Sequence, residues 1–345
     1  MYVLLFDSKI KKGDKNMSKL INQKPLPNIP FEEKPKGYLY PLWRYSNNPV
    51  IKRNVNKTID RTFNSSVVPY QGGFIGVFRG DKRNGCPNLF LGRSRDGVNF
   101  EIDESPIHFI NEKTGENSDT DWQYDPRLIE IDGVYYIVWC DSFAGATVAI
   151  AYTTDFVTFK KIDHPFLPNN RNGVLFPRKI NGNYYMLSRP SDLGHTPFGD
   201  IFVSCSPDLR FWGEHKFVLG RGWSWWTSLK VGGGPAPIEL DDGWLIFIHG
   251  VTQTCNGYVY SVGAIIVDKD DVSKVKYRCD DYLLTPQESY ETNGFVPNVV
   301  FPTSILIDGE TGRIAMYYGA ADSYTCLAFG YIDEIVDYVK KHSNI

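Results

Sequence analysis

Gly133-Val-Tyr-Tyr-Ile-Val-Trp-Cys-Asp141 is a glycine followed by a short, aromatic-rich strand that ends on a polar residue. Four other stretches share this form: Gly73-Phe-Ile-Gly-Val-Phe-Arg79, Gly182-Asn-Tyr-Tyr-Met-Leu-Ser-Arg189, Gly243-Trp-Leu-Ile-Phe-Ile-His249 and Gly312-Arg-Ile-Ala-Met-Tyr-Tyr-Gly-Ala-Ala-Asp322. They recur about every 50 to 70 residues, and strand-type repeats at that period are typical of a β-propeller. Because a propeller gathers one end of each blade around a central funnel, we expect the polar strand ends to share one site.

The segments around each aromatic strand complete a four-stranded unit. A partner segment near a proline precedes the strand, as in Asp125-Pro-Arg-Leu-Ile-Glu-Ile and Phe176-Pro-Arg-Lys-Ile. A third strand, a turn that carries Asp and an aromatic residue follow, as in Val148-Ala-Ile-Ala-Tyr-Thr-Thr-Asp-Phe-Val-Thr-Phe159. Five such units predict an all-β fold, a single five-bladed propeller over residues 41–345. The apolar residues Ile332, Ile335, Val336 and Val339 have helical spacing and predict a short C-terminal helix.

Composition excludes several classes of protein. The 345 residues carry a net charge of −3, which provides no field for nucleic acid or an anionic membrane, and no segment is long enough to span a membrane. Six cysteines without a C-x-x-C motif predict reduced thiols in a cytoplasmic protein, and six scattered histidines predict no metal site. We interpret residues 1–40 as an N-terminal extension. Met17 is an alternative start, which would place residues 1–16 upstream of the natural chain.

Polar residues gather at the predicted strand ends, and cations outnumber carboxylates among them. A funnel that contains several Arg and Lys side chains is expected to bind an anion, and the forked guanidinium of Arg suits phosphate oxygens. This set consists of Asn64, Ser65, Arg79, Tyr124, Asp125, Arg127, Arg171, Asn172, Arg178, Arg189, His195, Asp200, Lys230, His249, Tyr260 and Asp322.

Two elements of this set each allow two interpretations. Asp125, at the start of an inner strand, is either a general acid held protonated by enclosure or the partner of Arg127 in a salt bridge that shapes the strand. The segment Trp223-Ser-Trp-Trp226 either forms the wall of a sugar site or packs between blades. The residues alone leave both questions open.

Taken together, these stretches resemble glycoside hydrolase family 130, the inverting β-mannoside phosphorylases and related mannosidases. The resemblance runs from about residue 40 to 340 and is closest to the 4-O-β-D-mannosyl-D-glucose phosphorylase branch. It rests on ordered motifs: Asn64-Ser65, Val77-Phe-Arg79, Tyr124-Asp-Pro-Arg127, Asn170-Arg-Asn-Gly-Val-Leu-Phe-Pro-Arg178, Ser188-Arg-Pro-Ser-Asp-Leu-Gly-His-Thr-Pro-Phe-Gly-Asp200, Lys230, Gly233-Gly-Pro-Ala-Pro237, His249-Gly, Tyr260 and Tyr318-Gly-Ala-Ala-Asp322.

The resemblance implies a role for most residues of this set. Asp125 would be the only catalytic carboxylate, and it would reach the glycosidic oxygen through the mannose 3-hydroxyl as a proton relay. Phosphate would be held by Arg79, Arg171 and Lys230, with Asn64, Ser65 and Tyr260 nearby. The sugar would be bound by Tyr124, Arg127, His195, Asp200, His249 and Asp322. The resemblance assigns no role to Arg178 or Arg189.

The function implied is reversible phosphorolysis of a β-1,4-mannosyl-hexose to α-D-mannose 1-phosphate and a free sugar, with inversion. Phosphate would be the co-substrate, with no other cofactor. One alternative is a β-mannosidase of the same fold, for which Asp141, Asp200 and Asp322 are candidate second carboxylates. The other is a non-catalytic glycan-binding propeller. The expected partners are a saccharide and phosphate, and neither the acceptor sugar nor homo-oligomerisation is readable from the residues.

Overall fold

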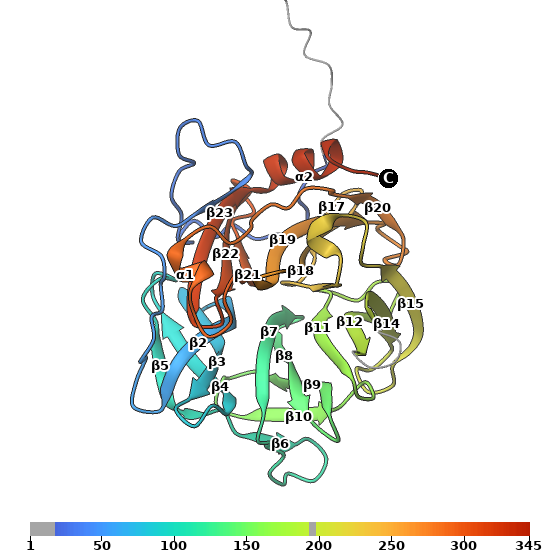
Figure 1. Cartoon of the computed structure of the whole chain (residues 1–345). Coiled ribbons are helices and arrows are strands. Elements are labelled where there is room, and N and C mark those ends of the chain that lie inside the picture. The colour runs from blue at the N-terminus through green and yellow to red at the C-terminus, as the bar shows by residue number, and fades with distance from the viewer. Residues whose placement is uncertain (1–17, 193–197) are drawn as a thin grey trace, which may run out of the picture.

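The computed structural model describes residues 18–192 and 198–345, which form five sheets arranged around a central axis (Figure 1). This confirms the predicted five-bladed propeller. The strands of each blade are given from the innermost strand outward. The first blade contains β2 (Ile59–Tyr70), β3 (Gly73–Lys82), β4 (Pro87–Ser94) and β5 (Glu101–Pro106), and the second contains β7 (Gln123–Ile131), β8 (Val134–Ser142), β9 (Ala146–Thr153), β10 (Phe159–Asp163) and β6 (Phe109–Asn111). The third contains β11 (Asn170–Leu175), β12 (Tyr184–Asp192), β14 (Ile201–Ser206) and β15 (Gly213–Leu219), with β13 (Phe198–Gly199) beside β12. The strands pair antiparallel except for β6, which runs parallel to β10.

The fourth blade has an additional inner strand, and the fifth takes its outermost strand from the N-terminal part of the chain. The fourth blade contains β16 (Lys230–Gly233), β18 (Gly243–Thr254), β19 (Gly257–Val267) and β20 (Val275–Arg278), and β17 (Ile238–Leu240) also pairs with β18. The fifth contains β21 (Val300–Ile307), β22 (Arg313–Ala320), β23 (Tyr324–Tyr331) and β1 (Leu42–Arg44). An N-terminal strand therefore completes the C-terminal blade and closes the ring.

Prolines place the inner strands differently from the sequence expectation in two blades. In the third blade the inner strand is Asn170–Leu175, so it lies before the Phe176-Pro-Arg-Lys-Ile segment that was predicted to form it. In the fourth blade, Gly234-Pro-Ala-Pro237 separates β16 from β17. Proline has no amide hydrogen to donate to a ladder, and it therefore interrupts both strands.

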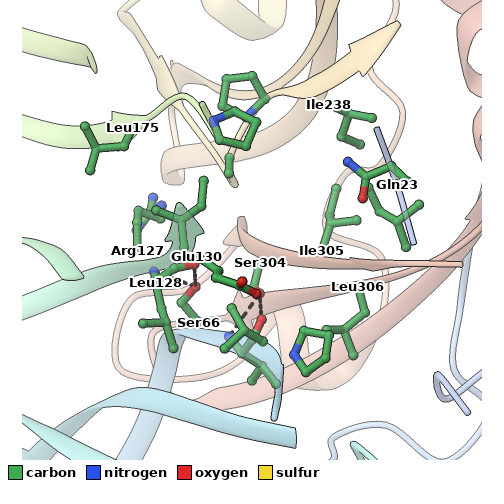
Figure 2. A pocket seen from close by; sticks show the side chains of 18 of the residues that line it. Gln23, Ser66, Arg127, Leu128, Glu130, Leu175, Ile238, Ser304, Ile305 and Leu306 are labelled. Atoms are coloured by element: carbon green, nitrogen blue, oxygen red, sulfur yellow. Dashed lines mark hydrogen bonds between the residues drawn. The ribbon is translucent and has the colours of Figure 1, made fainter. Parts of the chain in front are cut away.

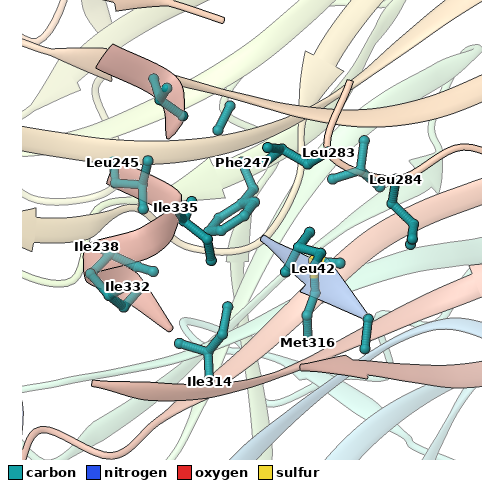
Figure 3. Close-up of a cluster of buried hydrophobic side chains, with 14 of the residues drawn as sticks. Leu42, Ile238, Leu245, Phe247, Leu283, Leu284, Ile314, Met316, Ile332 and Ile335 are labelled. Carbon is teal, nitrogen blue, oxygen red and sulfur yellow. The ribbon is translucent and has the colours of Figure 1, made fainter. Parts of the chain in front are cut away.

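The predicted C-terminal helix is α2 (Ile332–Lys341), and it buries the four apolar residues that predicted it. Its residues Ile332 and Ile335 belong to a cluster that joins the fourth and fifth blades (Figure 3). Phe247 of β18, Met316 of β22 and Leu42 of β1 lie in the same cluster. The helix therefore covers the seam at which the ring closes. No helix in the described part of the chain has the length and apolar character needed to cross a membrane.

Candidate active site

Three inner strands carry the same irregularity. At each one, two residues of the inner strand face a single residue of the neighbouring strand, and the first of the two has a positive φ: Asn64 (48°), Asp125 (54°) and Asn172 (54°). Asn and Asp tolerate this left-handed conformation better than most other residues. Such bulges bend a strand and redirect a side chain. They bring Asn64 and Asp125 of adjacent blades into contact, with 2.9 Å between Nδ2 and Oδ1.

The Asp125 carboxylate is held through one of its oxygens. Arg79 Nη1 donates to the same Oδ1 at 2.8 Å, and Arg79 Nε donates to Asp81 Oδ1 at 3.0 Å. Burial alone would lower the pKa of Arg79, but the carboxylates of Asp125, Asp81 and Asp322 raise it overall. Asp125 Oδ2 accepts no hydrogen bond from the described residues. This second oxygen remains open to a proton or a ligand.

Asp322 follows β22 in the fifth blade and has a φ of 45°. Burial raises the pKa of its carboxyl to about 6, and repulsion from Asp125 and Asp81 adds to the effect while Arg79 opposes it. Within residues 18–192 and 198–345, no side chain or amide donates a hydrogen bond to this carboxylate. A desolvated carboxylate without a protein partner is suited to accept hydrogen bonds from sugar hydroxyls.

A cationic group lies on the third and fourth blades, next to the carboxylates. It consists of Arg171, Arg189 and Lys230, and Arg171 Nε donates to Tyr124 Oη at 3.2 Å. Burial, together with the charges of Arg189 and Arg171, lowers the pKa of Lys230 to about 8. Burial also lowers the pKa of Arg189 to about 10. None of the three cations forms an ion pair with a carboxylate of the described chain. Buried or half-buried cations without an ion-paired carboxylate are suited to bind an anion.

His249 supports this cationic group from within the blade. It is fully buried, and burial together with Arg189 and Arg127 lowers its pKa well below the ordinary value, so the imidazole is neutral. Its Nε2 accepts a hydrogen bond from Arg189 Nη1 at 2.8 Å, and this bond assigns the tautomer. Tyr260, whose pKa burial raises to about 12, interacts electrostatically with both Arg189 and Asp322 and therefore links the two groups.

Other predicted site residues engage the protein itself. Buried Arg127 donates from Nε to the Gly234 carbonyl oxygen at 2.7 Å and from Nη1 to the Asp125 carbonyl oxygen at 3.0 Å. Ser65 Oγ donates to the Phe63 carbonyl oxygen, and both Asp200 oxygens accept from Arg221 Nη1 at 3.0–3.1 Å. Their ligand roles stay predictions, and His195 lies outside the described residues.

Sequence reasoning did not place several residues that the structure now locates. Arg189, to which the resemblance assigned no role, belongs to the cationic group. Asp81 forms an ion pair with Arg79, which lies two residues earlier on the same strand, and this spacing puts both side chains on one face. Arg178 instead pairs with Glu239 and lies over the Trp244 ring. In the tryptophan segment, Trp226 is fully buried and packs in a hydrophobic cluster, while Trp225 is 58% exposed.

The three acidic residues named as candidate hydrolytic bases differ in availability. Asp141 accepts from Lys161 Nζ at 2.6 Å, from His164 Nε2 at 2.8 Å and from Thr120. Burial by itself would raise the pKa of Asp141, but His164 and Lys161 lower it to about 2. Asp200 is paired with Arg221. Of the three, only Asp322 keeps its carboxylate available.

A separate cavity of about 470 Å³ lies along the inner strands (Figure 2). Its wall is mostly apolar and includes Leu128, Leu175, Ile238 and Leu306, with residues 22–26 of the N-terminal segment at one side. The hydroxyls that line it are already bonded to the main chain, as Ser66 and Ser304 show. Of the predicted site residues in the described chain, Arg127 is the one that also lines this cavity. The cavity therefore offers space, but neither Asp125 nor Asp322 nor a cation of the cationic group lines it.

Comparison with known proteins agrees with this geometry. The model of the glycoside hydrolase family described as beta-1,4-mannooligosaccharide phosphorylase matches residues 22–341. The chain is 49% identical to a β-1,4-mannooligosaccharide phosphorylase of Ruminococcus albus over 334 residues, which are 95% of this chain and 99% of that protein. It is 26% identical to a 4-O-β-D-mannosyl-D-glucose phosphorylase of Bacteroides fragilis over 97% of this chain and 92% of that protein. A β-1,2-mannobiose phosphorylase from Listeria innocua, solved with β-1,2-mannobiose, superposes with a TM-score of 0.77 at 27% identity, covering 87% of this chain and 99% of that one.

Proposed function

The chain belongs to glycoside hydrolase family 130, and from this premise we propose that it is an inverting β-mannoside phosphorylase. In the proposed reaction a phosphate oxygen attacks C1 of a β-mannosyl unit while the bond from C1 to the leaving sugar breaks. A proton from the Asp125 carboxyl passes to the leaving oxygen through the mannose 3-hydroxyl. The products are α-D-mannose 1-phosphate and a free sugar.

One observation carries the proposal: Arg171, Arg189 and Lys230 lie together without a carboxylate partner in the described chain, beside Asp125. A hydrolase needs a base to activate water, whereas phosphate is already an anionic nucleophile and needs only to be held. Several unpaired cations beside Asp125 therefore favour phosphorolysis over hydrolysis, and we assign the available carboxylate of Asp322 to the mannose hydroxyls. Phosphate is the co-substrate, and the proposed reaction uses no metal.

The hydrogen bonds of Asp125 fit a general acid. Arg79 and Asn64 both donate to Oδ1, which leaves Oδ2 to carry the proton. Asp322, with its open carboxylate, would accept from mannose hydroxyls, and Tyr260 would lie between the mannosyl unit and the phosphate. His249 and Arg127 would act by positioning, since His249 orients Arg189 and Arg127 ties the Asp125 main chain to Gly234.

We propose a β-1,4-linked manno-oligosaccharide as the substrate class. The relative with that name is 49% identical to the chain, and the mannosyl-glucose relative is 26% identical. The higher identity favours manno-oligosaccharides over mannosyl-glucose, so both belong in the first assay. The cytoplasmic location is also part of the proposal, and six cysteines without a disulfide are compatible with it.

The decisive assay incubates the enzyme with β-1,4-mannobiose or 4-O-β-D-mannosyl-D-glucose, with and without phosphate. We expect α-D-mannose 1-phosphate to form only with phosphate, and we expect Asp125→Asn to lower its rate about 10²- to 10⁴-fold. Release of free mannose at an undiminished rate without phosphate would instead identify a hydrolase. Sugar binding that Asp125→Asn leaves intact, without any turnover, would identify a glycan-binding propeller.

A further inference from the structure

One large aromatic ring stands exposed beside the predicted sugar carboxylate. Phe295 lies between α1 (Ser289–Thr292) and β21, and its side chain is 65% exposed. Its main-chain N–H donates to Ser323 Oγ at 2.9 Å, and the next amide, that of Val296, donates to the Ala321 carbonyl oxygen at 3.2 Å. Phe295 is thus tied to the turn that holds Asp322.

The Phe295 ring is also supported from the first blade. The Arg61 guanidinium lies 3.8 Å from the ring centroid, and the Arg61 side chain is only 9% exposed. Because the guanidinium occupies one face of the ring, the exposed surface of Phe295 belongs largely to its other face. An aromatic ring fixed on one face and open on the other is suited to stack against the apolar face of a sugar.

A continuous set of contacts connects this ring to the catalytic acid. Arg61 Nη2 contacts Asp81 Oδ2 at 3.1 Å, and Asp81 Oδ1 contacts Arg79 Nε at 3.0 Å. Arg79 in turn contacts Asp125. The positive charge of Arg61 also acts on the nearby Asp322 carboxyl and lowers its pKa, against the larger effect of burial. Phe295 therefore borders the same site from the side of the first and fifth blades.

The stereochemistry of inversion indicates which sugar would reach Phe295. In an inverting displacement the nucleophile and the leaving group lie on opposite faces of the reacting carbon. Arg79 of the first blade is paired with Asp81 and Asp125, and the cations left to hold phosphate, Arg171, Arg189 and Lys230, are on the third and fourth blades. The leaving sugar must therefore extend toward the opposite side of the funnel. The first and fifth blades, with Phe295, lie on that side.

We propose that Phe295 is a stacking platform for the leaving sugar, a neutral hexopyranose, and that it sets the enzyme's affinity for that sugar. This inference rests on the proposed phosphorolysis. Two other exposed aromatic residues are less suitable: the Tyr258 ring lies 5.8 Å from Lys230 Nζ, on the cationic side, and the Phe143 ring stacks on His164.

The test uses the reverse reaction, in which the acceptor sugar and the mannosyl donor can be varied separately. With α-D-mannose 1-phosphate and mannose or β-1,4-mannobiose, Phe295→Ala should raise the acceptor KM about 10-fold. The KM for α-D-mannose 1-phosphate should stay within about twofold of the wild-type value, because stacking acts on the acceptor alone. Phe295→Tyr should restore the acceptor KM.

A matched control is Phe211→Ala, since Phe211 is 76% exposed on the turn between β14 and β15. We expect it to change neither KM. An unchanged acceptor KM in Phe295→Ala, or an equal rise in both KM values, would overturn the platform while leaving phosphorolysis intact. Failure of the wild-type enzyme to form any disaccharide from α-D-mannose 1-phosphate would overturn the proposed function itself.

Discussion

Replacing Lys230 with Met should raise the free energy of unfolding of the phosphate-free protein and lower kcat/KM for phosphate. Burial, together with Arg189 and Arg171, lowers the pKa of Lys230 from 10.5 to about 8. That difference corresponds to about 3 kcal/mol of unfavourable free energy in the folded state at most. Because Lys230 is partly solvated, we expect a gain of about 1–3 kcal/mol, and Met preserves most of the packing of the stem.

The sign of the pH dependence follows from the lowered pKa. Below pH 8 Lys230 is charged in both the folded and the unfolded chain, so the folded state bears the full cost. Between pH 8 and 10.5 the folded protein releases the proton first and the cost fades. The stability gain of Lys230→Met should therefore be largest below pH 8 and vanish above about pH 10.5.

The same substitution removes a cation from the proposed phosphate site. A hydrogen bond to a charged group contributes about 1.5–3 kcal/mol, so kcat/KM for phosphate should fall about 10- to 150-fold. In the wild-type enzyme, Lys230 loses its charge above pH 8, and kcat/KM for phosphate should fall there as well.

Urea unfolding without phosphate and phosphorolysis assays of the same preparations measure both effects. Lys216→Met is the control, because Lys216 is exposed on β15 and the substitution makes the same change in charge. We expect the control to alter neither quantity appreciably. A Lys230→Met protein that is less stable at pH 7, or that keeps the wild-type kcat/KM for phosphate, would refute the assignment of these cations to an anion site.

Two further predictions concern buried charges elsewhere in the ring. Because burial raises the pKa of Asp322 to about 6, Asp322→Asn should stabilise the protein by up to about 3 kcal/mol above pH 6, and this gain should disappear below about pH 4. Thermal melting at a series of pH values from 4 to 8 measures the stability difference. The same substitution should abolish mannoside turnover. Arg44→Met should lower the free energy of unfolding by about 3–5 kcal/mol in urea, because it leaves the fully buried Glu291 carboxylate without its cation, and an unchanged unfolding midpoint would contradict that reasoning.

The predictable part of the fold rests on local chemistry. The glycine-led strands correspond to β3, β8, β12, β18 and β22, since each turn and its aromatic strand are encoded within about ten residues. The C-terminal helix was predictable for the same reason, because four apolar residues at helical spacing mark one buried face. Closure of the ring by β1 had no such signal, because its pairing with β23 joins residues nearly 300 positions apart.

The candidate site was predictable in its residue types and less so in their contacts. Asp125 could be singled out at a strand start, but its two open interpretations depended on Arg127. The Arg127 guanidinium turns out to bind main-chain carbonyls, whereas Arg79 and Asn64 contact the Asp125 carboxylate. Trp226 was also left with two interpretations, a wall of the sugar site or a core residue. Its packing in a buried hydrophobic cluster identifies it as a core residue.

The amino-acid sequence by itself determined the repeat, the strand and helix segments, and the excess of cations over carboxylates at the strand ends. Only the tertiary structure decided which of those groups meet. Arg189 reaches His249 from 60 residues away, and Phe295, which precedes the inner strand of the fifth blade, reaches Arg61 of the first blade. Local sequence specifies backbone geometry, but these contacts exist only once five blades close around one axis, and a left-handed bulge then directs Asp125 toward Asn64 of the adjacent blade.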